Sequence, residues 1–200
     1  MSHTAFFYGT LMAPPVLHRV IWGSPTPPTA AHASLLRIQP AILHAHQRHK
    51  VKHADYPAIL PTPSSPSSSV RGTLVEGLTD GDIWRLDIFE GGEYARRKVH
   101  VRVLEQQENG SNAEADEVEA ETYIWTAGAD RLEADEWDFA EFVRDKMGRW
   151  VGSEGVQVDE GFKDVDDAVA ALRDPTGGRG ANGKISKALE GNEKVLESAV

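Results

Sequence analysis

A glutamate in an unusual position is the first residue of this chain that could do chemistry. In the stretch 82–94, Ile83, Leu86 and Glu90 stand at i, i+3 and i+7 of a helical pattern, so the carboxylate shares a stripe with two aliphatic side chains. The glycines at 91–92 favour the end of that helix. Because apolar surroundings raise the pKa of a carboxyl group, Glu90 is a candidate proton acceptor. The alternative is a surface glutamate on a slightly misphased helix.

A glycine turn near the N-terminus is the second candidate. The aromatic run 5–8 is typical of a buried first strand, Gly9 and Thr10 interrupt it, and the proline pair at 14–15 favours the start of a helix. A glycine turn between a buried strand and a helix presents free backbone N–H groups. These groups could hold either a substrate carboxylate or a developing oxyanion, and the sequence favours neither role over the other.

Other patterns give weaker signals. The segment 178–184 is similar to a phosphate-binding loop, but Ile185 replaces the required Ser or Thr and no apolar strand precedes it, which favours a flexible tail. Four histidines form a basic cluster whose spacing matches no metal motif, so a solvated face is favoured over a metal site: His44, His46, His49 and His53. Serine-hydrolase and zincin motifs are absent from the sequence, and zero cysteines leave no thiol nucleophile.

The composition limits the class of protein. Two hundred residues suffice for a domain of about 150 residues with an appendage. The net charge of −10 argues against a nucleic-acid partner. No apolar run has the length needed to cross a bilayer, and residues 1–4 lack the basic start of a signal peptide. We therefore expect a cytoplasmic protein with no membrane contact.

The order of the elements predicts an α+β fold. Six segments have the apolar content or the alternation of strands: 5–8, 33–46, 56–61, 70–78, 98–103 and 122–126. Three segments are predicted to contain helices: 14–21, 82–90 and 137–147. Thr79 is expected to cap the second helix, with Asp82 at the third position of a capping box. The stretch 105–121, with seven acidic side chains, is predicted to be mostly a solvated hairpin loop.

The predicted architecture is a small mixed β-barrel flanked by helices, since a barrel leaves no exposed strand edges. The domain is expected to span 1–153. Residues 154–200 form a C-terminal extension that either packs on the domain or stays partly disordered, with possible helices at 164–173 and 185–200.

Four motifs in a fixed order resemble those of the gamma-glutamylcyclotransferase-like proteins, the group that includes the plant avirulence-induced proteins. They are Phe-Tyr-Gly-Thr-Leu at 7–11, Tyr-Pro-Ala at 56–58, Arg-Gly-Thr-Leu at 71–74, and Leu-Asp-x-Phe-Glu-Gly-x-x-Tyr-x-Arg at 86–96. The likeness covers about residues 4–126, and the combination is more specific than any one piece. It implies a barrel with a cavity at one end.

The resemblance also implies a reaction and a site. The substrate would be a small gamma-glutamyl amide, and the products would be 5-oxoproline and a free amine, formed without a cofactor. The implied proton acceptor is Glu90. The implied substrate-binding residues are Tyr8, Gly9, Thr10, Leu11 and Tyr94. The leaving amine would be selected by the loops 23–32, 47–55 and 62–69. The alternative is a catalytically silent module that binds a small ligand, or a protein partner through the acidic loop or the C-terminal tail.

Overall fold

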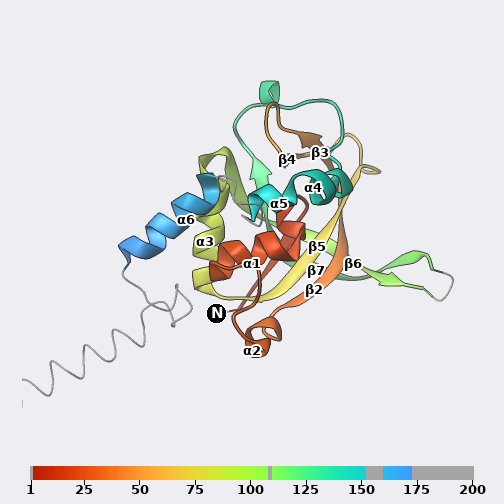
Figure 1. Cartoon of the computed structure of the whole chain (residues 1–200). Helices are drawn as coiled ribbons and strands as arrows, with labels where there is room; N and C mark the ends of the chain where they lie inside the picture. Colours follow the sequence, from red (N-terminus) through yellow and green to blue (C-terminus); the bar gives the residue numbers. More distant parts are fainter. Residues whose placement is uncertain (1, 108–109, 152–159, 173–200) are drawn as a thin grey trace, which may run out of the picture.

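Five strands form a closed barrel in the computed structural model, which describes residues 2–107, 110–151 and 160–172. In spatial order they are β1 (His3–Phe7), β5 (Ser69–Leu78), β2 (Arg37–His44), β6 (Tyr94–Gln106) and β7 (Asn112–Trp125). The strands β3 (His46–Lys50) and β4 (Pro57–Pro61) form a separate two-stranded sheet. Figure 1 shows the larger helices gathered on one side of the barrel. The predicted α+β fold with a small mixed barrel is confirmed.

The side chains of β1 belong to two different hydrophobic cores. Phe6 belongs to a cluster with Leu74 and Val101 from the barrel strands, whereas its neighbour Phe7 packs in a second cluster with helical residues such as Val16. Successive side chains of a strand point to opposite faces of the sheet, which explains this division. The barrel closes where β1 runs parallel to β7, at the pair Ala5 and Glu121.

The second strand differs from its prediction. It begins at Arg37, because residues Ala30–Ala33 form the short helix α2 instead. Pro40 does not interrupt it and lies opposite Thr73 of β5. On its other side, β2 pairs with β6 only at Ala41 and Ile42, so Pro40 lies outside that short ladder and its missing N–H removes no bond from it.

The acidic stretch 105–121 is mostly strand, so the prediction of a solvated loop is wrong for residues 112–121. Its carboxylates lie opposite basic side chains of β6. Lys98 donates to Glu119 at 2.7 Å, Arg102 donates to Glu117 at 3.2 Å, and Arg96 pairs with Glu121. Opposite charges on facing strands stabilise the pairing, so the acidic side chains are compatible with a long hairpin.

The helices that frame the barrel begin and end at recognisable signals. Helix α1 (Pro14–Trp22) begins with two prolines and ends at Gly23, whose φ of 73° is left-handed. Helix α3 (Asp80–Glu90) has the predicted cap: Thr79 Oγ1 accepts from the Asp82 N–H, and Asp82 accepts from the Thr79 N–H. This reciprocal capping box fixes the start of the helix that ends at Glu90. The described residues also include three short 3-10 helices: η1 (Thr10–Met12), η2 (Gly91–Glu93) and η3 (Ala129–Arg131).

The predicted helix 137–147 is two short helices, α4 (Phe139–Asp145) and α5 (Met147–Trp150). Lys146 separates them with non-helical backbone angles, and its ammonium lies 3.1 Å from a carboxylate oxygen of Asp55. The single-helix prediction is therefore wrong at this residue, where a tertiary ion pair accompanies the break.

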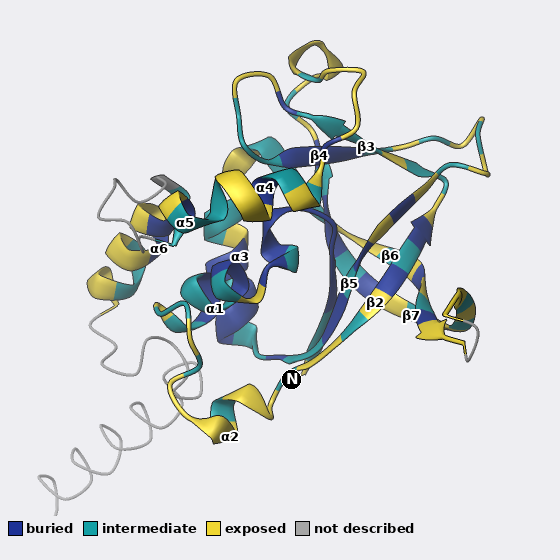
Figure 2. Cartoon of the chain, turned by 45° about the vertical axis from the view of Figure 1, so that its right-hand side comes forward, coloured by how far each residue is buried: buried dark blue, intermediate teal, exposed yellow. Residues whose placement is uncertain are grey.

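One helix of the predicted C-terminal extension is described. Helix α6 (Glu160–Ala171) packs on α1 and α3, and it begins four residues before the predicted start. Phe162 and Val165 are buried, whereas most other α6 residues are exposed (Figure 2). The predicted helix 185–200 and the loop 178–184 lie outside the described residues. None of the described helices has the length and apolar content needed to span a membrane.

Candidate active site

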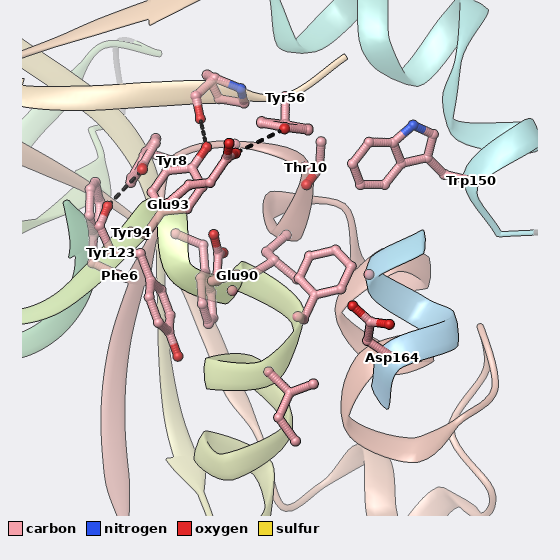
Figure 3. Close-up of a pocket in the computed structure, with 18 residues that line it drawn as sticks. Phe6, Tyr8, Thr10, Tyr56, Glu90, Glu93, Tyr94, Tyr123, Trp150 and Asp164 are labelled. Atoms are coloured by element: carbon pink, nitrogen blue, oxygen red, sulfur yellow. Dashed lines mark hydrogen bonds between the residues drawn. The ribbon is translucent and has the colours of Figure 1, made fainter. Parts of the chain in front are cut away.

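A cavity of about 500 Å³ lies where the N-terminal turn meets the end of α3 (Figure 3). Residues from β1, η1, β4, α3, η2, β6 and β7 line it, together with residues from α5 and α6. All six residues that the sequence singled out lie in its wall: Tyr8, Gly9, Thr10, Leu11, Glu90 and Tyr94. The fold thus brings the glycine turn and the candidate base into one cavity.

Glu90 is the last residue of α3, and the chain leaves the helix at Gly91 with φ of 63°. Burial raises the pKa of Glu90 from its ordinary value of 4.5 to about 8, and the negative charge of Asp87 contributes to the same shift. The side chain retains some accessible surface in the cavity wall. No hydrogen bond or ion pair joins its carboxylate to the part of the chain that the structure describes. A carboxyl group in this state can accept or donate a proton near neutral pH.

Three tyrosines make the wall of the cavity on one side of Glu90 (Figure 3). The Tyr8 hydroxyl donates to the Tyr123 carbonyl at 2.7 Å, and the Tyr94 hydroxyl donates to the Pro57 carbonyl at 2.9 Å. Tyr123 itself donates to an Asp87 carboxylate oxygen at 2.9 Å. Burial raises the pKa of all three phenols, so they stay neutral, and their protons are already engaged. Their hydroxyl groups are therefore held in fixed positions in the cavity wall.

The glycine turn is held from outside the cavity by an arginine that sequence reasoning missed. Arg48 of β3 donates to the Tyr8 carbonyl at 2.9 Å and to a Glu136 carboxylate oxygen at 2.9 Å. Helix η1 begins directly after Gly9, and the first N–H groups of a helical turn have no acceptor within the turn. The turn can therefore present backbone donors to an anionic group in the cavity.

Glu93, a second acidic residue of the cavity wall, is paired with a cation. Glu93 accepts a hydrogen bond from the Tyr56 hydroxyl at 3.1 Å and forms an ion pair with Arg131. Tyr56 stands in the Tyr-Pro-Ala motif, so its presence near the site had a sequence signal, whereas Glu93 and Arg131 had none. The ion pair between Glu93 and Arg131 fixes the rim of the cavity at η2. Glu90, next to the glycine turn, has no such partner among the described residues.

The histidines lie away from this cavity. His44 contacts the Glu114 carboxylate at 3.0 Å, and His49 hydrogen-bonds the Glu133 carbonyl at 3.0 Å through Nδ1. Within the described ranges, no group of three or more His, Cys, Asp or Glu side chains is arranged to hold a metal ion.

Comparison with known proteins gives the family. The family described as gamma-glutamyl cyclotransferase, AIG2-like, matches residues 5–139. The chain belongs to this family. Protein AIG2 C of Arabidopsis thaliana is 32% identical over 141 residues, covering 70% of this chain and 72% of the relative. Protein AIG2 B of the same plant is 29% identical over 151 residues, covering 76% of each chain.

A solved structure has a similar fold. The solution structure of an Arabidopsis thaliana protein superposes with a TM-score of 0.50 and 26% sequence identity, covering 91% of this chain and 90% of that one. The gamma-glutamyl cyclotransferase-like fold that the sequence motifs implied is thereby confirmed.

In this AIG2-like chain, part of the cavity lies beyond the residues that the family match covers. Trp150 of α5 and two α6 residues, Gly161 and Asp164, line the cavity. None of the lining residues comes from the loops 23–32, 47–55 or 62–69, all of which the structure describes. The prediction that those loops line the cavity is therefore wrong, and α5 and α6 contribute lining residues instead.

Proposed function

We propose that this protein is a cyclotransferase that converts a gamma-glutamyl amide into 5-oxoproline and a free amine. The observation that carries the proposal is the placement of Glu90, a carboxyl group with a pKa of about 8, in one cavity with the Gly9 turn. Membership of the gamma-glutamyl cyclotransferase, AIG2-like family supports it. The motif residues of the family resemblance supply both parts of this arrangement.

The reaction uses a nucleophile that the substrate already carries. Glu90 accepts one proton from the α-ammonium group, and the resulting amine attacks the γ-carbonyl carbon to form a five-membered ring. The protonated Glu90 then donates its proton to the leaving nitrogen as the amide C–N bond breaks. The ring nitrogen, which still carries an extra proton, returns one to Glu90, and that proton leaves with the amine as its ammonium ion. Glu90 ends as a carboxylate, so the cycle is complete.

This chemistry explains why neither a serine, a cysteine nor a metal ion is needed. The protein has to fold the glutamyl chain so that its amine reaches its own carbonyl, and it has to stabilise the oxyanion that forms. Backbone N–H groups of the turn at Gly9, Thr10 and Leu11 are the proposed donors, for either the substrate carboxylate or the oxyanion. The walls formed by Tyr8 and Tyr94 would hold the folded chain, because their own hydroxyls are fixed by hydrogen bonds.

A panel assay tests the proposal directly. The purified protein is incubated with gamma-glutamyl amides of amines, amino acids and peptides, and 5-oxoproline is detected by mass. Glu90→Gln should lower turnover by about a thousandfold, since general acid–base catalysis contributes factors of this order. Glu119→Gln, which removes an exposed carboxylate on β7, is the matched control and should keep full activity.

Two outcomes would count against the proposal. Equal 5-oxoproline release by Glu90→Gln, with the fold intact by circular dichroism, would remove Glu90 from the mechanism. Tight binding of the amides with no 5-oxoproline from the unaltered protein would favour the alternative, a binding module that has kept the cavity without the reaction.

A further inference from the structure

All ionisable Asp, Glu, Lys, Arg and His side chains among the described lining residues of the cavity are acidic. Three acidic side chains line the cavity, those of Glu90, Glu93 and Asp164, and no lysine, arginine or histidine is among its described lining residues. Glu93 is balanced by Arg131 and by the Tyr56 hydroxyl. Asp164 is exposed and forms no ion pair with any residue that the structure describes. A ligand that reaches Asp164 therefore meets an uncompensated negative charge.

Asp164 is held in place by the docking of its helix. Phe162 is fully buried, with its ring centroid 5.0 Å from that of Phe89 and 6.1 Å from that of Trp150. On the neighbouring turn, Asp166 accepts two hydrogen bonds from Arg19 of α1, at 2.9 and 2.6 Å. These contacts fix α6 against the framework of the cavity, so Asp164 keeps a defined position in its wall.

The two ends of the cavity differ in chemistry. Figure 3 shows Glu90 between the tyrosine side, with Tyr8 and Tyr94, and the side on which Trp150 and Asp164 lie. In the proposed reaction the glutamyl head occupies the Tyr8 end, next to the glycine turn. The leaving amine then extends from the γ-carbonyl past Glu90 toward Trp150 and Asp164. An indole face and a carboxylate are together suited to an alkyl chain that ends in a cation.

We propose that Asp164 is a specificity-determining residue that selects leaving amines carrying a second positive charge. This inference rests on the proposed function and adds the substrate class. The selecting residue comes from α6, beyond the family match at 5–139, so the barrel would supply the ring-forming chemistry and the C-terminal helix the choice of leaving amine. A leaving group that ends in a carboxylate would be disfavoured, because no cation of the described wall could compensate it.

Three gamma-glutamyl amides of equal reach test the proposal, those of cadaverine, n-hexylamine and ε-aminocaproate, which end in an ammonium, a methyl and a carboxylate group. Asp164→Asn should lower kcat/KM for the cadaverine amide by about fivefold, as expected for one partly solvated ion pair. The hexylamide should be unaffected, and the aminocaproate amide should improve. Asp167→Asn removes an equal charge from the same helix outside the cavity and should change none of the three.

Binding separates this inference from the proposed function. Affinities of the three amides are measured by calorimetry in Glu90→Gln, with and without Asp164→Asn. If the protein prefers to bind the cadaverine amide and this preference disappears with Asp164→Asn, the charge selection is supported. That result holds even if the unaltered protein releases no 5-oxoproline, because the absence of turnover would contradict only the proposed reaction. Equal losses for all three amides would place Asp164 at the α-ammonium of the glutamyl head and overturn the inference. No effect of Asp164→Asn, or no binding of any amide, would overturn it as well.

Discussion

Gly9 lies so close to Pro57 that a Cβ atom at position 9 would be 2.7 Å from Cγ and 2.8 Å from Cδ of the proline ring. Pro57 is the first residue of β4, and its carbonyl accepts the hydrogen bond from Tyr94. The N-terminal turn, β4 and the start of β6 therefore form one continuous wall of the cavity. A residue without a side chain at position 9 allows this close approach.

Gly9→Ala should damage the site more than the fold. The added methyl group must push β4 or the turn outward, and displacements near 1 Å at a reacting centre cost about a hundredfold in rate. We expect kcat/KM to fall by about this factor while circular dichroism stays unchanged. Gly92→Ala is the control, since a Cβ there meets no atom within 4 Å, and it should be neutral. Full activity of Gly9→Ala would show that the turn does not position the substrate.

The rate should depend on pH through Glu90. A base acts only when ionised, and burial raises the pKa of Glu90 to about 8. In the free protein the carboxyl group is therefore mostly protonated at neutral pH. We expect kcat/KM to rise with pH and to level off above a midpoint near 8. The measurement is kcat/KM between about pH 6 and about pH 9, the range that brackets this pKa. A midpoint that persists in the residual activity of Glu90→Gln would assign it to another group.

Stability should depend on pH through the same residue. The folded-state pKa of Glu90, about 8, lies above its ordinary value of 4.5, so between these values the folded state binds a proton that the unfolded state has released. The protein should therefore lose stability as pH rises from 4.5 to 8. Glu90→Gln lacks this ionisation, so its Tm should exceed that of the unaltered protein by about 10 °C more at the upper end of the range than at the lower. A constant Tm difference would mean that Glu90 is solvated.

The sequence predicted those parts of the molecule that depend on local chemistry. The capping box at Thr79, the proline start of α1 and the glycine after Glu90 each act within a few residues, and the structure has all three. The prediction for the acidic strand β7 was wrong because its structure depends on residues that are distant in the sequence. Its carboxylates are tolerated because β6 places basic side chains across from them, and a partner strand cannot be read from the strand itself.

In the candidate site, too, the sequence predicted the residues that stand in motifs but not those that tertiary packing brings to the cavity. Glu90, Tyr8 and Tyr94 stood in motifs, and they line one cavity. Trp150 and Asp164 lie far along the chain. Trp150 reaches the cavity from α5, and Asp164 reaches it because α6 docks on α1 and α3. The amphipathic pattern predicted a helix in this part of the chain, but not the surface on which it packs, since docking depends on the shape of distant elements.

The largest buried side chain of α6 is the ring of Phe162. Phe162 contacts Phe89 and Trp150 and lies under the guanidinium of Arg19, 5.3 Å from the ring centroid. Phe162→Ala should cost about 3–5 kcal/mol of the packing free energy, more than a helix of this length can lose and remain docked. We expect faster tryptic cleavage after Lys163 and loss of any discrimination among leaving amines, while 5-oxoproline formation by the barrel continues. Leu172→Ala is the control, because that side chain is 59% exposed and its truncation should leave cleavage unchanged. Unaltered cleavage of Phe162→Ala would mean that buried Val165 and the Arg19–Asp166 contact are sufficient to hold the helix.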